Sequence, residues 1–132
     1  MATGRNVLIV EDDRDFVNAL KTVFESRNYQ VRCAYDGQAG FAEIQQQKPD
    51  ALVLDVMMST LTEGFDLAFH LKSKAEFRDI PIVMVTGFPH EMTTLGPEKF
   101  QNALREDWPA AKILEKPVDP EQVLGAVESL LQ

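Results

Sequence analysis

The feature that most constrains the fold is a regular alternation of short apolar runs with longer amphipathic segments. Three runs consist almost entirely of Val, Ile, Leu, Ala and Met, at residues 7–10, 51–54 and 80–85. Such runs are typical of central parallel strands that helices cover on both faces. Two further runs, residues 30–35 and 112–115, mix polar with apolar residues and are expected to form the edge strands of the sheet. The alternation therefore predicts an α/β fold with five strands.

Helices are expected between these runs and after the last of them. The first has its apolar residues on one helical face, namely Phe16, Val17, Leu20, Val23 and Phe24. Asp36 is predicted to cap a helix that runs to residue 47, and Asp119 and Pro120 to open a final helix. Another helix is predicted over residues 64–72, and one more begins at Pro97. Right-handed crossovers would complete an open, doubly wound sheet.

Length and composition predict one ordered domain over residues 1–132, without room for a second. The hydrophobic share of 45% and charged share of 26% are those of a globular protein. A net charge of -8 argues against direct binding to nucleic acid, because phosphate backbones are bound by clustered Lys and Arg. Cys33 is the only cysteine, and no apolar run approaches the roughly 20 residues that span a bilayer. A cytoplasmic location without membrane insertion is therefore expected.

Four of the predicted strands end in residues that can bind a cation or a phosphate. Glu11 and Asp12 follow the first strand and Asp55 follows the third. Thr86 ends the fourth strand, and Lys116 follows the fifth. Because ligands of open α/β sheets bind beyond the carboxyl ends of the strands, these side chains are expected to share one site.

Carboxylates that lie so close repel one another, so a cation is expected among Glu11, Asp12 and Asp55. Mg²⁺ fits, because it prefers oxygen ligands and is usually held by one or two carboxylates, water and a phosphate oxygen. The spacing of an EF-hand is absent from the sequence, and Cys33, His70 and His90 lack the spacing of zinc ligands. A magnesium-assisted phosphoryl transfer to Asp55 follows as the predicted chemistry.

The other groups at these strand ends suit the same reaction. Thr86 offers a hydroxyl and Lys116 an ammonium to phosphoryl oxygens. Gly87 has no side chain, so its backbone N–H can approach a third oxygen. Taken singly, each feature has an ordinary explanation, since acids after a strand often cap helices and a Lys-Pro pair often forms a turn. Their joint placement at four strand ends favours a functional site.

Four segments, "VLIVEDD", "ALVLDVMM", "PIVMVTG" and "EKPVD", resemble in order the motifs of the response-regulator receiver family of two-component signalling. The resemblance extends from Arg5 to Leu131. It implies a CheY-like, three-layer (βα)5 sandwich with strand order 2-1-3-4-5. It further implies that Glu11 and Asp12 are the acidic pair, Asp55 the phosphoacceptor, Thr86 the switch hydroxyl, Lys116 the conserved-type lysine and Met57 a backbone carbonyl ligand of Mg²⁺.

The resemblance also implies a phosphorylation-dependent switch rather than an enzyme. Its phosphodonor would be a sensor histidine kinase or a histidine phosphotransfer protein. Its output would pass to an unknown partner protein through the face of the fourth helix, fifth strand and last helix, because no output domain is expected after the last helix.

Several residues depart from the family pattern. Ser59 stands where the family usually has proline, and Gly64 comes one residue late. The stretch between Thr86 and Lys116 is longer than usual by roughly eight residues, a length better explained by added structure than by bare loop. The loop after Asp55 and the signalling face are therefore expected to differ from the usual family form.

Three apolar residues are predicted to alter switching and phosphoryl lifetime. Ile113 replaces the aromatic switch residue of the family. Met57 and Phe88 occupy the two positions that influence attack of water on the phosphoryl group. Because both are bulky and apolar, at most slow self-dephosphorylation is predicted.

Other interpretations remain open at this point. A receiver-like scaffold without phosphorylation would bind its partner constitutively. An aspartyl phosphatase or a flavin carrier fits less well, because Met57 replaces the second Asp of such phosphatases and the first loop is acidic. His70 and His90 are expected to have surface or packing roles. The aromatic residues Phe65, Phe69, Phe77 and Trp108 are expected to lie in the core or to cover it.

Overall fold

The computed structural model describes residues 5–55, 63–86, 112–115 and 118–131. Within these ranges, residues 63–65, 86, 113 and 115 are described by their backbone alone. The helix predicted to begin at Pro97 lies outside the described residues.

Five parallel strands form one sheet in the order β2-β1-β3-β4-β5, which confirms the predicted topology. The strands are β1 (Asn6–Val10), β2 (Gln30–Ala34), β3 (Ala51–Asp55), β4 (Ile82–Thr86) and β5 (Lys112–Glu115). The order places β1 and β3 side by side at the centre, with Val10 opposite Leu54. The polar run of β2 lies at an edge and is partly exposed, as its composition predicted.

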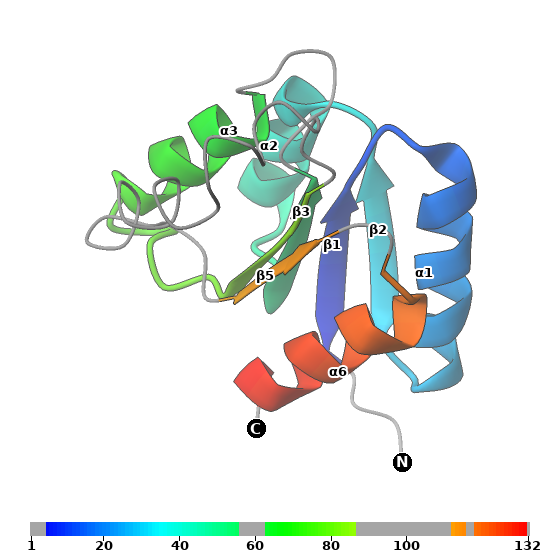
Figure 1. The fold of residues 1–132 in the computed structure, drawn as a ribbon. Coiled ribbons are helices and arrows are strands. Elements are labelled where there is room, and N and C mark those ends of the chain that lie inside the picture. The colour runs from blue at the N-terminus through cyan, green and yellow to red at the C-terminus, as the bar shows by residue number, and fades with distance from the viewer. Residues whose placement is uncertain (1–4, 56–62, 87–111, 116–117, 132) are drawn as a thin grey trace.

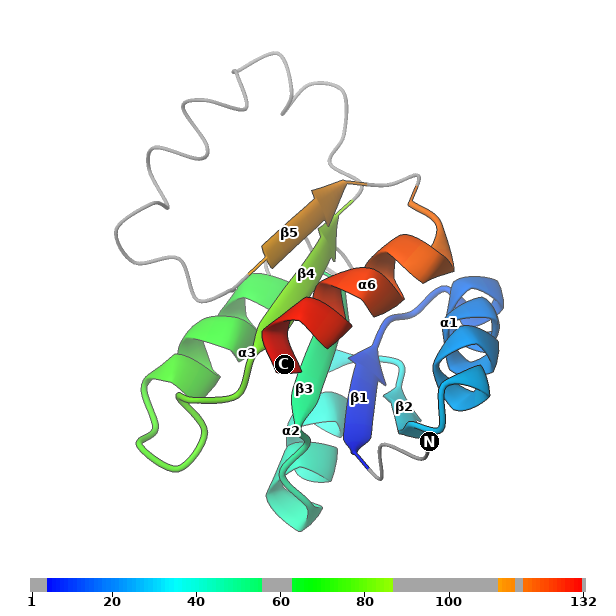
Figure 2. The same ribbon diagram turned by 90° about the horizontal axis from the view of Figure 1, so that it is seen from below.

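Helices cover both faces of the sheet, so the described chain has three layers (Figure 1). The four described helices are α1 (Arg14–Ser26), α2 (Gly37–Gln46), α3 (Glu63–Lys72) and α6 (Pro120–Leu131). Figure 2 shows α1 and α6 on one face and α2 and α3 on the other. Because all five strands are parallel, their carboxyl ends lie on the same side of the molecule.

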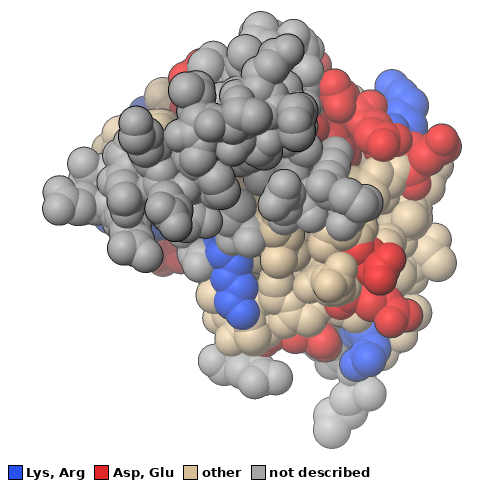
Figure 3. Space-filling view, viewed as in Figure 1, with Lys and Arg blue, Asp and Glu red and all other residues tan. Residues whose placement is uncertain are grey.

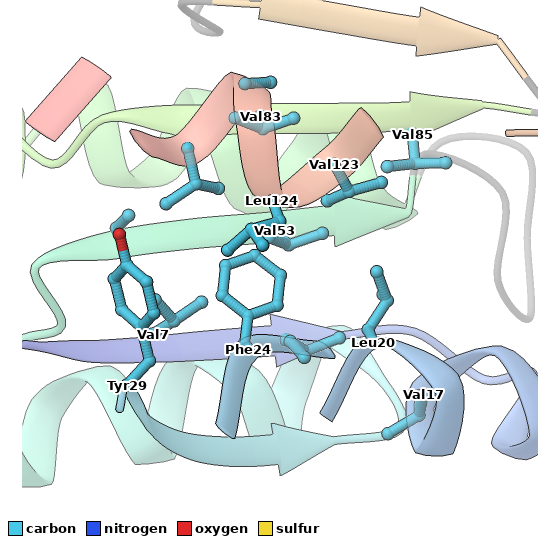
Figure 4. Packing of buried hydrophobic residues seen from close by; sticks show 14 residues of the cluster. Val7, Val17, Leu20, Phe24, Tyr29, Val53, Val83, Val85, Val123 and Leu124 are labelled. Carbon is cyan, nitrogen blue, oxygen red and sulfur yellow. The ribbon is translucent and has the colours of Figure 1, made fainter. Parts of the chain in front are cut away.

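The core between α1, α6 and the sheet is built from the residues that predicted the first helix. Val17, Leu20 and Phe24 of α1 are buried, and Figure 4 shows them facing side chains of the sheet and of α6. The rings of Phe24 and Tyr29 meet edge to face with their centroids 5.4 Å apart. This apolar stripe at helical spacing is what docks α1.

On the opposite face, α2 lies unusually close to β1. A Cβ atom at Gly40 would come within 2.8 Å of Val10 Cγ2, so this approach requires glycine. Val10 is the last residue of β1 and directly precedes Glu11. The packing of α2 therefore supports the end of the strand from which the acidic residues begin.

One aromatic residue differs from its predicted packing role. Phe77 is buried as expected, but the Phe69 side chain is 41% exposed. The inward face of α3 is formed by Leu67, Ala68 and Leu71. At about 100° per residue, Phe69 is turned well away from Leu67 and Leu71, so the core has no place for its ring.

Among the described residues, no helix is both long and apolar enough to cross a bilayer.

Candidate functional site

The topology of the sheet brings the predicted acidic residues together. Glu11 and Asp12 directly follow β1, and Asp55 is the last residue of β3. These strands are neighbours, and their register places Val10 opposite Leu54. Glu11 and Asp55 come one residue later in each strand, so they lie next to each other at the carboxyl ends of β1 and β3.

The three carboxylates form a compact cluster. Each offers one oxygen, and these oxygens all lie within 4.8 Å of one another. Glu11 is only 2% exposed and Asp55 only 3%, whereas Asp12 is exposed. The predicted proximity of the three residues is confirmed. Glu11 and Asp55 thus form the buried part of the cluster, and the side chain of Asp12 reaches solvent.

Backbone hydrogen bonds hold the end of β1 in place. Glu11 N–H donates to the carbonyl oxygen of Ala34 at 3.0 Å, which extends the pairing with β2 by one residue. Asp13 then caps α1, since its side chain accepts hydrogen bonds from the N–H groups of Asp15 and Phe16 at 3.1 and 3.3 Å. Helix capping therefore accounts for Asp13 and leaves Glu11 and Asp12 for the cluster.

The donor set fits a hard divalent cation. Among the described residues, the cluster consists of three carboxylates without a nitrogen or sulfur ligand, which is the chemistry that Mg²⁺ prefers. Other acids follow it in the chain: Asp13 and Asp15 are both exposed, and Figure 3 shows acidic side chains gathered at the end of the molecule where α1 begins. Crowded negative charge of this kind attracts cations.

The imidazole of His70 takes no part in the cluster. It is exposed on α3 and packs edge to face against Phe41, with ring centroids 4.7 Å apart. His70 therefore has the surface or packing role that was predicted for it. His90 lies outside the described residues.

The remaining predicted site residues are placed only in part. Thr86 ends β4 opposite Glu115, so its backbone lies at the expected edge of the sheet, but its side chain is not described. Ile113 pairs with Met84 in β5 and is likewise described by its backbone. Four further predicted residues lie outside the described ranges, namely Met57, Gly87, Phe88 and Lys116. Their roles stay predictions.

A cation that the sequence did not single out lies beside the acidic residues. Arg14 opens α1, and its guanidinium carbon is 4.0 Å from the centroid of the Tyr35 ring. Tyr35 directly follows β2, at the same edge of the sheet. The available signal was weak, because Arg14 is one base within the acidic run of residues 11–15 and its aromatic partner belongs to another βα connection.

Comparison with known proteins decides the family. Residues 7–128 match the model of the response regulator receiver domain. The chain belongs to this family. Among curated relatives, this receiver domain is 30% identical to protein PilH of Pseudomonas aeruginosa over 95% of the chain and 96% of that protein. It is 28% identical to the alkaline phosphatase synthesis transcriptional regulatory protein PhoP of Bacillus subtilis, over 98% of the chain.

The chain spans only about half of the length of PhoP, 49%. It is 38% identical to the response regulator MprA of Mycobacterium avium over 61% of this chain, and the match covers 34% of MprA. Solved structures agree on the fold. A putative response regulator from Chloroflexus aurantiacus is 27% identical with a TM-score of 0.80, covering 98% of both chains. The chemotaxis response regulator CheY4 of Vibrio cholerae is 26% identical with a TM-score of 0.80, covering 98% of this chain and all of that one.

Proposed function

We propose that this receiver domain accepts a phosphoryl group on Asp55 in a Mg²⁺-dependent reaction and thereby switches its binding to a partner protein. Receiver domains are phosphorylation-dependent signalling switches as a family. The observation that carries the proposal is the cluster itself, in which oxygens of Asp55, Glu11 and Asp12 lie within 4.8 Å of one another at the end of the central strands. A nucleophile that shares its site with two further carboxylates is suited to a reaction that uses a divalent cation.

Glu11, Asp12 and Asp55 would hold the ion, together with the backbone carbonyl of Met57. When bound, Mg²⁺ would neutralise the negative charge that otherwise keeps a carboxylate away from an anionic phosphoryl group. The buried carboxylates of Glu11 and Asp55 are held by the sheet, while the exposed side chain of Asp12 leaves the cluster open to solvent on one side. The site is therefore preorganised and accessible at the same time.

In the proposed transfer, an Asp55 carboxylate oxygen attacks the phosphorus atom of a phosphohistidine. The phosphorus–nitrogen bond breaks, and the imidazole leaves with the electron pair and takes up a proton. Lys116, Thr86 and the backbone N–H of Gly87 would neutralise or hydrogen-bond the phosphoryl oxygens during this step. The product is an aspartyl phosphate, and no oxidation or reduction occurs.

The test is labelling with acetyl phosphate in the presence of Mg²⁺. Mass spectrometry of the intact wild-type protein is expected to detect one added phosphoryl group, which chelation of Mg²⁺ prevents. Asp55→Asn should abolish the label, whereas Asp36→Asn should retain it, because Asp36 caps α2 at the same edge of the sheet and asparagine caps helices equally well. An unlabelled wild-type protein would favour the unphosphorylated scaffold instead.

A sensor histidine kinase or a histidine phosphotransfer protein is the proposed donor, and an unidentified protein the proposed recipient of the signal. The cytoplasm is the proposed compartment. The readout surface would combine β5 and α6 with the unusually long stretch between Thr86 and Lys116. Hydrogen exchange in residues 88–108 is expected to change on phosphorylation, and unchanged exchange there would exclude that segment as the readout.

The phosphorylated state is proposed to be long-lived, and the domain to have no enzymatic activity beyond slow self-dephosphorylation. Met57 and Phe88 are apolar and cannot orient a hydrolytic water at the two positions that influence its attack. Replacing both by polar residues should shorten the lifetime of the phosphoryl group on Asp55. A lifetime unchanged in that double variant would contradict this assignment.

A further inference from the structure

In the described segments around Asp55, acidic side chains oppose the approach of an anionic phosphodonor. Within residues 11–15, 35–37 and 55, six side chains are acidic, namely Glu11, Asp12, Asp13, Asp15, Asp36 and Asp55. Arg14 is the one base in these three segments. A divalent cation would offset only part of this charge, so the approach of a phosphoryl group is opposed by the remaining carboxylates.

Arg14 is held at this edge by an aromatic ring rather than by an acid. Its guanidinium stacks over Tyr35 at 4.0 Å, and Tyr35 is itself partly buried against the core beneath α1. Among the described residues, no carboxylate forms an ion pair with Arg14. The side chain is exposed, so its charge is presented to solvent, next in the chain to Asp13 and Asp15.

We propose that Arg14, stacked on Tyr35, is a positioning residue that draws the anionic phosphoryl group of the donor toward Asp55. This inference rests on the phosphoacceptor function proposed above and adds the group that meets the donor first. A cation fixed against a ring acts in a defined place, unlike a freely moving surface arginine. A unit charge that acts over about ten ångströms of water changes the local concentration of a mono- or dianion by about two- to fourfold.

The test compares rates of phosphorylation by acetyl phosphate and by phosphoimidazole, which represent acyl phosphates and phosphohistidine. Both are measured at saturating Mg²⁺ and low ionic strength. Arg14→Gln should lower the rate by about two- to fourfold. Arg14→Lys should restore most of it, because lysine keeps the charge. Arg27→Gln is the matched control: Arg27 caps the other end of α1, and its removal should leave the rate unchanged.

Two further measurements separate steering of the donor from damage to the site. At about 1 M salt, where charges are screened within about 3 Å, Arg14→Gln should react as fast as the wild type. Its affinity for Mg²⁺ should be unchanged or slightly higher, since a nearby positive charge has been removed, whereas a distorted cluster would bind Mg²⁺ more weakly. Tyr35→Leu, which releases the guanidinium, should lower the rate by a smaller factor than Arg14→Gln.

The outcomes distinguish this inference from the function on which it rests. A slower reaction of Arg14→Gln with both donors assigns the contact to the phosphoryl group that they share, and a slower reaction with one donor assigns it to that class of donor. Equal rates for Arg14→Gln and wild type at low salt overturn the inference and leave the phosphoacceptor function intact. A wild-type protein that is never labelled on Asp55 overturns the phosphoacceptor function instead.

Discussion

At the scale of single residues, the acidic cluster combines burial with crowding of like charges. Glu11 and Asp55 have almost no exposure to water, and Asp12 brings a third carboxylate to within 4.8 Å. Two like charges about 4 Å apart repel by about 1 kcal/mol even in water, and by more in a less polar surrounding. We therefore expect this crowding to lower the stability of the metal-free protein and to favour the binding of a cation.

Removing one of these charges should therefore raise the stability of the metal-free protein. Asp12→Asn is expected to raise the free energy of unfolding of the metal-free protein by about 1 kcal/mol. The same variant should gain less stability than the wild type when Mg²⁺ is added, because at a given concentration a ligand that binds less tightly stabilises the folded protein less. Urea denaturation with EDTA and with Mg²⁺ measures both effects. Asp15→Asn, an exposed acid outside the cluster, should retain the full response to Mg²⁺.

At the scale of secondary-structure elements, the connection between β1 and α1 joins the site to the fold. Only three residues separate Val10 from Arg14. Glu11 and Asp12 belong to the cluster, and Asp13 caps the helix through two backbone N–H groups. Because the cluster and the helix cap use different side chains, the effect of removing the cap should be measurable without loss of the cluster.

The N-cap gives a prediction at this scale. Asp13→Ala should lower the free energy of unfolding by about 1 kcal/mol, since it removes the acceptor for the N–H groups of Asp15 and Phe16. Asp13→Asn keeps an oxygen in the same place and should lose much less. Thermal denaturation of the two variants in parallel measures the difference. Equal losses would mean that the charge of Asp13, rather than its hydrogen bonds, stabilises α1.

At the scale of the whole molecule, one face of the sheet contains two ionisable groups whose pKa values are raised by burial. Burial raises the pKa of the Tyr29 hydroxyl above its usual value of 10.0, with a further contribution from Glu128. Burial likewise raises the pKa of the Cys33 thiol above 9.0. Both residues belong to, or pack against, the core that α1 and α6 share with the sheet.

These shifts predict loss of stability at alkaline pH. The unfolded chain releases each proton at the ordinary pKa, before the folded protein does. The free energy of unfolding should therefore be unaffected by these groups below pH 9.0 and should fall as the pH rises through and beyond their ordinary pKa values. Denaturation between pH 8 and 11 measures the slope. The slope should be smaller in Tyr29→Phe and in Cys33→Ser, neither of which can ionise there.

The sequence by itself determined the positions of the apolar runs that form the strands, the inward face of α1 and the three acids of the cluster. These features follow from local rules. Strands that are buried on both faces need continuous apolar runs, and helical spacing places Val17, Leu20 and Phe24 on one face. The carboxyl ends of parallel strands lie together, which gathers the three acids. The same local reasoning was wrong for Phe69, because an aromatic residue near an apolar helical face was expected to pack or cover the core, and α3 has no inward position for it.

Only the tertiary structure decided the contacts that join different βα units. The approach of Gly40 to Val10 depends on how closely α2 docks on the sheet. The stacking of Arg14 on Tyr35 depends on the pairing of β1 with β2, which carries the start of α1 next to the end of β2. No periodicity links such residues along the chain, since their distance is set by packing between elements rather than by the geometry within one.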